Sequence, residues 1–170
     1  MTPRILLTGA TGFVGQPLLW ELVRRGYWVR TVSRQPRRFW SNDHIEGDLV
    51  VPSVCRLATT GIDLVIHVAG EIRRRDLMRA TNVIATQQLG MAALDAKVQH
   101  FVHISTASTR THTDYCQTKR EGEALIQTIG ELHTMKVSIL RPPTLYGGKR
   151  GPKWLQWVKL WLMGRPLKLA

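Results

Sequence analysis

Cysteine is scarce in this chain of 170 residues, and the scarcity narrows the kinds of protein it can be. Cys55 and Cys116 are too few for a disulfide framework, and neither belongs to a CxxC motif or to a Cys/His cluster with the spacing of metal ligands. The sequence therefore predicts no metal site. It also predicts a reducing compartment, for which the cytoplasm is the default.

The sequence also predicts no secretion signal, because such a signal needs a basic segment followed by an apolar one. The apolar run Ile5-Leu6-Leu7 begins within a few residues of Met1 and reads as a β-strand. No low-complexity linker interrupts the chain, and 44% of its residues are hydrophobic. This composition is typical of one globular domain with a proper core.

Acidic residues are few: 12 Asp and Glu stand against 24 Lys and Arg, which gives a net charge of +12. Such an excess raises the question of a nucleic acid or an anionic membrane as partner. The basic residues are spread along the chain, however, without helix-turn-helix, RNP-type or zinc-finger spacing. We expect a solvated basic surface with a few contacts to phosphate-bearing small molecules, and no dedicated nucleic-acid binding.

Short apolar segments alternate with longer amphipathic ones, which favours βαβ units around a parallel sheet covered by helices on both faces. We predict an α/β fold of the Rossmann type, a doubly wound parallel sheet with the strand order 3-2-1-4-5-6. The predicted strands are Arg4–Thr8, Trp28–Ser33, His44–Glu46, Asp63–Val68, His100–Ser105 and Lys136–Leu140. The predicted long helices are Phe13–Arg25, Asp76–Leu94 and Asp114–Ile129.

A glycine-rich turn, TGATGFVG at residues 8–15, joins the first strand to the first helix. Its three glycines can supply a tight turn, a close approach of the backbone to phosphate, and tight packing of the helix on the strand. An anion would then lie at the positive N-terminus of the helix. A glycine triplet also occurs in ordinary strand-to-helix turns, but its place at the first strand favours a dinucleotide site. The residues assigned to this site are Gly9, Thr11, Gly12, Phe13, Val14 and Gly15.

Six motifs follow one another in a fixed order, and together they carry a family resemblance. They are the glycine turn, His67-Val68-Ala69-Gly70, Asn82, Ile104-Ser105-Thr106, Tyr115-Cys-Gln-Thr-Lys119 and Arg141-Pro-Pro-Thr-Leu-Tyr-Gly147. In this order the sequence resembles the extended short-chain dehydrogenase/reductases almost end to end. It is most similar to their NAD-dependent epimerase/dehydratase family, whose members mostly act on nucleotide sugars. The resemblance implies an NAD(P)-dependent oxidoreductase, epimerase or dehydratase.

The resemblance also implies catalytic roles. Tyr115 would be the general acid/base, and Lys119 would assist it and bind the nicotinamide ribose. Thr106, with Ser105 as the alternative, would hydrogen-bond the reacting oxygen, and Asn82 would support the proton relay. The residues themselves fit this assignment, since a spacing of four places Lys119 beside Tyr115 on one helix face. Tyrosine titrates near pH ~10, so Lys119 and an oxidised nicotinamide would have to lower its pKa.

Three other side chains are of types that often act in catalysis or as ligands, but we assign no such role to them. His67 and His103 occur in apolar strand patterns and are predicted to be core or strand-end residues. Cys116 is predicted to pack.

The end of the second strand bears on the choice of cofactor. It reads Thr31-Val32-Ser33-Arg34, and Ser33 occupies the place of the acid that binds the ribose hydroxyls of NAD, so we assign Ser33 to the cofactor site. Arg34, supported by Arg37 or Arg38, offers a planar donor fork suited to a 2′-phosphate. NADP(H) is therefore favoured, with NAD(H) as the alternative. By resemblance, the cofactor would also be lined by Asp48, Leu49, Val68, Ala69, Gly70, Pro142, Pro143 and Thr144.

Tyr115 follows Thr106 by nine positions, fewer than the family usually places there, so the loop that shapes the substrate pocket is trimmed. Two functions stay open. One is an enzyme acting on a small molecule, a nucleotide sugar or a related alcohol or carbonyl compound. The other is a non-catalytic NAD(P)-binding accessory or sensor protein, like the accessory subunit of respiratory complex I.

The composition changes after Pro142-Pro143, and we place the one domain boundary near there. Residues 1–148 would form the NAD(P)-binding domain, and residues 149–170 would begin a truncated substrate-binding region. Lys153–Met163 carries an apolar tryptophan stripe, for which packing on further chain is favoured over contact with a membrane surface. By resemblance, a homodimer would form through the helices that carry Asn82 and Tyr115.

Overall fold

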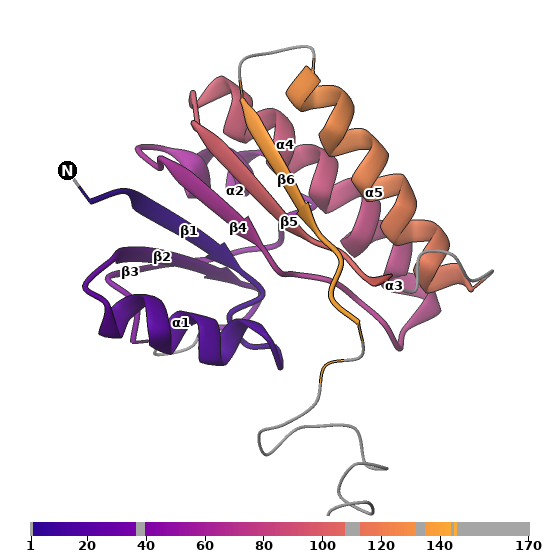
Figure 1. The fold of residues 1–170 in the computed structure, drawn as a ribbon, viewed down its shortest axis with the longest axis horizontal. Coiled ribbons are helices and arrows are strands. Elements are labelled where there is room, and N and C mark those ends of the chain that lie inside the picture. Colours follow the sequence, from indigo (N-terminus) through magenta and orange to yellow (C-terminus); the bar gives the residue numbers. More distant parts are fainter. Residues whose placement is uncertain (1, 37–39, 108–112, 132–134, 144, 146–170) are drawn as a thin grey trace, which may run out of the picture.

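One parallel sheet of six strands organises the molecule (Figure 1). The structure is a computed structural model, and it describes residues 2–36, 40–107, 113–131, 135–143 and 145. The strand order is β3-β2-β1-β4-β5-β6, which confirms the predicted topology. The strands are β1 Arg4–Thr8, β2 Trp28–Ser33, β3 Asp43–Glu46, β4 Leu64–His67, β5 His100–Ile104 and β6 Lys136–Leu140.

Helices cover both faces of this sheet, as the sequence predicts. In Figure 1, α1 lies alone on one face, and α2, α4 and α5 lie together on the other. The helical segments are α1 Gly15–Arg24, α2 Pro52–Thr59, α3 Arg75–Arg79, the π-helical turn η1 Ala80–Ile84, α4 Ala85–Asp95 and α5 Asp114–Glu131. The predicted region 149–170, with its tryptophan stripe, lies outside the described residues.

The alternation of side chains along β1 divides the core in two. Leu6 faces the larger layer with Phe101 and Ile126, whereas the next residue, Leu7, faces α1 and packs with Leu19. All five of these side chains are buried. Because both faces of the strand are covered, its sequence is a continuous apolar run and not an alternating one.

The strand order reverses beside β1, which pairs with β2 on one side and with β4 on the other. In the register, Thr8 lies opposite His67, and His67 lies opposite His103 on β5. These three buried residues therefore form a row near the carboxyl ends of neighbouring strands. Ligands of open α/β sheets bind at this edge, next to the point of reversal.

A buried hydrogen-bond chain runs from this row into the helical layer. The backbone N–H groups of Val68 and Ala69 both donate to Thr8 Oγ1, at 3.2 Å each. Thr8 therefore donates its own proton to Nδ1 of His67, at 2.8 Å. The other nitrogen of that ring, Nε2, donates to Thr86 Oγ1 at 3.0 Å. His67 is thus held as the neutral tautomer with its proton on Nε2.

His103 stacks on His67, with ring centroids 5.4 Å apart and an interplanar angle of 28°. Both rings are fully buried, as the sequence predicts for core residues. Burial is the main cause that lowers the pKa of His67, to about 3, and the positive charge of Lys119 lowers it further. The same two causes hold the pKa of His103 well below its ordinary range. Neither nitrogen of His103 has a hydrogen-bond partner.

Two parts of the helical layer differ from the prediction. Helix α2 was not predicted, and the predicted helix Asp76–Leu94 is three segments, because η1 inserts one π-helical turn. Asn82 lies within that turn and binds neighbouring elements. Its Nδ2 donates to Glu71 O and Thr118 Oγ1, at 2.9 and 3.0 Å, and its Oδ1 accepts from Glu71 N at 2.8 Å.

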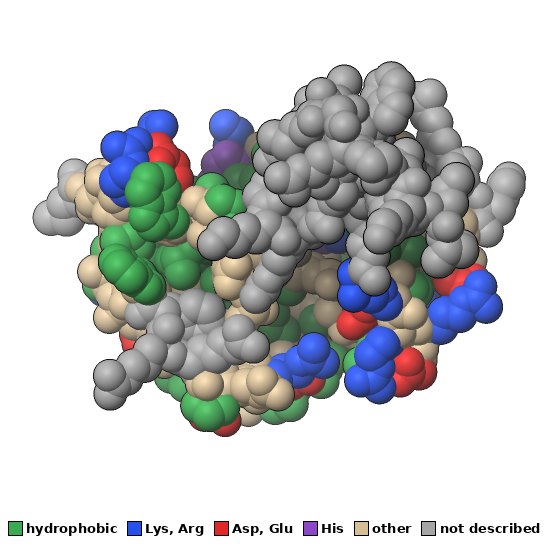
Figure 2. Space-filling model, turned by 90° about the horizontal axis from the view of Figure 1, so that it is seen from below, with side chains coloured by type: hydrophobic (Ala, Val, Ile, Leu, Met, Phe, Trp, Pro, Cys, Tyr) green, Lys and Arg blue, Asp and Glu red, His purple; other side chains and the backbone are tan. Residues whose placement is uncertain are grey.

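Many basic side chains of the described surface are paired with carboxylates. Arg24 and Arg25 share Glu21 on α1, and Arg79 on α3 reaches Glu121 on α5 at 2.5 Å. Figure 2 shows several such basic and acidic side chains next to each other on one face. Exposed pairs of this kind contribute little to stability, about 0–1 kcal/mol each. Their main effect here is to divide the positive charge into small, separate patches.

Two further observations concern the described part of the chain. None of its helices is long and apolar enough to cross a membrane. Cys55 and Cys116 are both buried and do not form a disulfide, and Cys55 Sγ lies 3.1 Å from Leu49 O. Burial raises the pKa of the Cys55 thiol to about 12, so this side chain packs as a protonated thiol.

Candidate functional site

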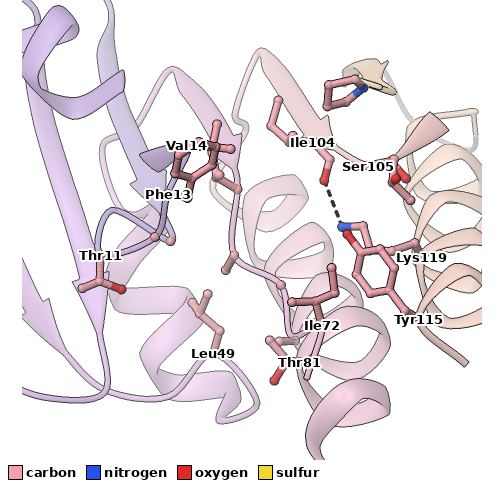
Figure 3. A pocket seen from close by; sticks show the side chains of 18 of the residues that line it. Thr11, Phe13, Val14, Leu49, Ile72, Thr81, Ile104, Ser105, Tyr115 and Lys119 are labelled. Carbon is pink, nitrogen blue, oxygen red and sulfur yellow. Dashed lines mark hydrogen bonds between the residues drawn. The ribbon is translucent and has the colours of Figure 1, made fainter. Parts of the chain in front are cut away.

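A pocket of about 780 Å³ opens at the carboxyl edge of the sheet, where the strand order reverses (Figure 3). The turn after β1 and the end of β2 form one part of its wall. The ends of β4, β5 and β6 and the start of α5 form the rest. Of the residues assigned to the site from the sequence, the pocket is lined by Gly9, Thr11, Gly12, Phe13, Val14, Ser33, Arg34, Asp48, Leu49, Val68, Ala69, Gly70, Ser105, Thr106, Tyr115, Lys119, Pro142 and Pro143.

Four assigned residues are not among those that line this pocket. Gly15 lies at the start of α1, beneath the turn, and Asn82 is buried in η1. Arg38 and Thr144 lie outside the described residues.

The glycine turn has the close contacts that a phosphate-binding turn needs. Gly9 has φ +69°, and a Cβ on it would lie 2.6 Å from Ala69 N. A Cβ on Gly15 would meet the Gly9 carbonyl oxygen and lie 2.9 Å from Ala10 Cα. These two glycines are therefore required by the backbone, one for its left-handed conformation and both for the close approach of neighbouring chain.

Gly12 differs from the other two glycines. Its N–H donates to Gly9 O at 2.9 Å, and the one neighbour that a Cβ would meet is the same oxygen, at 3.2 Å. Gly12 also lines the pocket. Its missing side chain therefore leaves room in the cavity. Helix α1 begins three residues later without a side-chain cap and without an acidic residue in its first turn, which suits an anion at that end.

Tyr115 and Lys119 stand on the opposite wall, one helical turn apart on α5. Figure 3 shows both side chains extending from α5 toward the end of β5. Lys119 is 2% exposed, and its Nζ donates to Ile104 O at 2.9 Å. Burial lowers the pKa of Lys119 to about 8, and the carboxylate of Glu123 partly opposes this shift.

The pKa of Tyr115 is raised, chiefly by burial and to a smaller extent by Cys116. For Tyr115 to act as a base near neutral pH, Lys119 and an oxidised nicotinamide would have to lower this pKa. In the protein alone burial raises it instead, because the charged phenolate is less well solvated there. In the protein alone, Tyr115 is therefore protonated at neutral pH.

The two hydroxyls after β5 have different surroundings, although both line the pocket. Ser105 is 5% exposed, and its Oγ donates to Oε1 of Glu123 on α5. The hydroxyl proton of Ser105 is therefore used in a hydrogen bond that points away from the pocket, toward Glu123. Thr106 is the next residue and is half-buried.

Asn82 has a supporting position behind the site. Its amide is saturated by Glu71 and Thr118, so it fastens the loop after β4 to α5, three residues beyond Tyr115. A Cβ on Gly70 would lie 3.3 Å from Asn82 Oδ1 and 3.9 Å from Lys119 Nζ. The absence of a side chain at Gly70 therefore allows the amide, the ammonium and the β4 loop to lie together.

Arg34 directly follows β2 and lines the pocket, and Asp48 lines the part of the wall that follows β3. Ser33 donates its hydroxyl proton to Gln35 O at 2.8 Å, which orders the turn that carries Arg34. Asp48 Oδ1 accepts from Val50 N at 3.1 Å. Among the described residues of the wall, Arg34, Asp48 and Lys119 are the ones with charged side chains.

Sequence reasoning missed part of the wall. Ile72 follows Gly70 by two residues at the carboxyl end of β4, so its nearness to a known motif could have indicated it. Thr81 lies within the π-helical turn and Ala85 directly follows it, and no sequence signal marked that turn. The residues missed are Val32, Gly47, Ile72, Thr81, Ala85, Ile104, Thr113, Cys116 and Leu145. In the described ranges, no group of His, Cys, Asp or Glu side chains is arranged to hold a metal ion.

Comparison with known proteins gives consistent matches. The sequence pattern of the NAD-dependent epimerase/dehydratase family matches residues 5–157. The 3 beta-hydroxysteroid dehydrogenase/Delta 5→4-isomerase of Mycobacterium tuberculosis is 31% identical, over 85% of this chain and 47% of the relative. Ceramide reductase of Caulobacter vibrioides is 32% identical, over 84% of this chain and 46% of the relative.

Among solved structures, MoeE5 in complex with UDP-glucose and NAD superposes with a TM-score of 0.79 and 28% identity. That match covers 96% of this chain and 62% of MoeE5. The chain spans about half the length of the curated relatives it matches.

Proposed function

Because the chain belongs to the NAD-dependent epimerase/dehydratase family, we propose that it binds a nicotinamide dinucleotide and catalyses hydride transfer at an alcohol or carbonyl carbon. One observation carries the proposal: the glycine turn and the pair Tyr115–Lys119 line opposite walls of the same pocket. A pyrophosphate on the turn would direct the rest of a dinucleotide along the edge of the sheet toward Tyr115.

The residues present fit such a cofactor. Gly9 and Gly15 allow the close backbone approach, Gly12 leaves room in the cavity, and the uncapped start of α1 offers its positive end to phosphate. When bound, the nicotinamide supplies the site that accepts or donates the hydride.

Gly12 supplies a test of this fit. We expect Gly12→Ala to weaken dinucleotide binding by at least ~10-fold, about 1.4 kcal/mol, because the methyl group would occupy the space of the phosphate. The free energy of unfolding should change by less than ~1 kcal/mol, since the one contact is a 3.2 Å approach to Gly9 O.

Nicotinamide fluorescence and urea denaturation measure the two effects separately. Gly26→Ala is the matched control, because Gly26 has φ +79° and lies away from the pocket. That variant should lose stability and keep its affinity. A Gly12→Ala variant with wild-type affinity would contradict the assignment of the phosphate to this turn.

In the proposed reaction Tyr115 handles the proton. Its raised pKa keeps the phenol protonated, which suits it to donate a proton to the oxygen of a carbonyl that is being reduced. Lys119 lies beside it and would stabilise the phenolate that remains. We assign the hydrogen bond to the reacting oxygen to Thr106, because the proton of Ser105 is engaged by Glu123. Asn82 has a positioning role through Glu71 and Thr118.

NADP(H) is the proposed cofactor. The support is Arg34 in the pocket at the end of β2, together with the lack of an acidic side chain at that strand end. A guanidinium can bind a 2′-phosphate with two charge-assisted hydrogen bonds, whereas the ribose hydroxyls of NAD(H) need an acceptor there. NAD(H) is the alternative, and MoeE5 was solved with NAD.

The first experiment titrates the chain with NADPH and NADH and follows nicotinamide fluorescence. We expect Arg34→Ala to weaken NADPH binding by about 10–100-fold, the equivalent of one lost charge-assisted contact, and to leave NADH binding within ~2-fold. Arg56→Ala, an exposed arginine on α2, is the control and should change neither affinity.

Failure to bind either nucleotide would overturn the proposed function. Tight binding without turnover of any substrate would favour an accessory or sensor protein instead.

A small-molecule substrate is proposed, a nucleotide sugar or a related alcohol or carbonyl compound. MoeE5 was solved with UDP-glucose, while the two curated relatives are named for a hydroxysteroid and for ceramide. A screen should therefore contain UDP-glucose, a 3β-hydroxysteroid and a ceramide, each with both cofactors. Formation or loss of the reduced nicotinamide at 340 nm would identify the substrate class.

A further inference from the structure

Glu123 is a buried carboxylate behind the candidate site. It lies on α5, one helical turn beyond Lys119, and is 5% exposed. Its Oε1 accepts a hydrogen bond from Ser105 Oγ. Its Oε2 accepts from Arg141 Nε and Nη2, at 2.9 and 2.5 Å. A buried carboxylate is costly unless it is paired and hydrogen-bonded, and both conditions are met here.

These contacts join the ends of two strands to the helix. Ser105 is the first residue after β5, and Arg141 is the first after β6. The two ends also bond each other, with Ser105 N donating to Leu140 O at 2.7 Å and Ala107 N to Pro142 O at 3.0 Å. Thr106 follows Ser105 and Pro142 follows Arg141, and both of these following residues line the pocket. Glu123 thus fixes both pocket segments against the helix that carries Tyr115 and Lys119.

Glu123 also sets the charge around Lys119. Burial lowers the pKa of Lys119, and Glu123 is the carboxylate that opposes this effect. The other titratable groups near the ammonium are Tyr115 on the same helix and the neutral rings of His67 on β4 and His103 on β5. None of these three supplies a negative charge at neutral pH. Arg141 compensates part of the charge of Glu123 from the outer side, where it is 48% exposed.

We propose that Glu123 is a positioning residue for proton transfer, which holds the ends of β5 and β6 in place and keeps the ammonium of Lys119 charged beside Tyr115. The inference rests on the proposed function in so far as Tyr115 and Lys119 are the proton-transfer pair. It assigns a role to a side chain that does not line the pocket and touches no substrate.

The test measures the pKa of Lys119 in the chain without ligands, by NMR of ¹³C-labelled lysine side chains, with Lys119→Arg to assign the signal. We expect Glu123→Gln to lower this pKa by about one pH unit or more, as for loss of an opposite charge at close range. Arg141→Gln should raise it, because the carboxylate would then act on Lys119 without compensation. Glu121→Gln, which breaks an exposed ion pair on the same helix, should leave it unchanged.

A lower pKa of Lys119 in Glu123→Gln and a higher one in Arg141→Gln would support the proposal, since a purely structural defect would move the pKa in the same direction in both variants. No shift in either, or shifts of the same sign, would overturn it. Should Glu123→Gln fail to fold, the other two variants still test the proposal: the pKa of Lys119 must rise in Arg141→Gln and stay unchanged in Glu121→Gln. Because the measurement is made without cofactor, its result does not depend on NADPH binding. If the unmutated chain does not bind NADPH, that finding counts against the proposed function alone.

Discussion

Replacing Tyr115 by phenylalanine is expected to lower kcat by about 10²–10⁴-fold, the usual contribution of a positioned general acid. The phenol is protonated and lines the pocket, one helical turn from Lys119. Phenylalanine keeps the ring and its packing but removes the proton donor. We therefore expect the loss in kcat alone, with dinucleotide affinity within ~3-fold of the unmutated chain, since in the proposed reaction the hydroxyl acts on the reacting oxygen and not on the phosphates.

The measurement is initial-rate kinetics on the substrate found by the screen, with fluorescence titration of the cofactor in parallel. Tyr27→Phe removes a phenol outside the pocket and should keep full activity. A Tyr115→Phe variant that retains more than ~10% of kcat would argue for another proton donor. Loss of cofactor binding together with activity would instead indicate a folding defect.

Acidification is expected to destabilise the protein steeply between about pH 6.5 and pH 4, because His67 and His103 are buried as neutral rings. The folded state resists their protonation, with the pKa of His67 at about 3 and that of His103 well below its ordinary range. The unfolded chain protonates both near pH ~6.5. It therefore binds more protons than the folded chain in this window, and the free energy of unfolding falls as the pH falls.

The expected loss is about 2 kcal/mol per ring at pH 5, or about 4 kcal/mol for the pair, from the 1.36 kcal/mol that each pH unit contributes. Domains of this size have only about 5–15 kcal/mol in total, so much of the stability would be lost. Urea denaturation followed by circular dichroism from pH 7.5 to pH 4.5 measures the effect.

His103→Phe should remove about half of this pH dependence, because that ring has no hydrogen bond to lose. His100→Gln is the control: His100 is only partly buried, with a smaller lowering of its pKa, and most of the dependence should remain. A flat stability profile between pH 7 and pH 5 would contradict the buried neutral pair.

The sheet could be predicted from the sequence because its strands are short apolar runs separated by turn residues. The prediction for β1 and β2 matches the structure at both ends, and the strand order follows from the alternation of strands and helices. Helix α2 could not be found in the same way. It has only eight residues, its buried face carries the small side chains of Cys55, Ala58 and Thr59, and its first turn begins at Pro52 after an extended residue. Packing against α4 stabilises this helix, and a local sequence pattern does not reveal such tertiary packing.

The motif residues of the site could likewise be assigned to one edge of the sheet, since each follows a predicted strand or begins a predicted helix. The partners of those residues could not. The π-helical turn at Asn82 depends on hydrogen bonds to Glu71 and Thr118, which lie 11 and 36 positions away. The choice between Ser105 and Thr106 depends on Glu123, 18 positions beyond Ser105 on another element. Only the folded chain brings these groups together.

The central position of β1 has a consequence for the order of events during synthesis. Of the described strands β1 leaves the ribosome first, yet its second partner, β4, follows about 60 positions later, with Thr8 and His67 separated by 59. β5 and β6 join only afterwards, in sequence, each adding one strand to the growing edge. Until then the apolar edge of the unfinished sheet is unpaired, the condition under which nascent chains aggregate. Arg141 follows β6, so its contact with Glu123, and with it this part of the pocket wall, can form only after the last of the six described strands has been synthesised.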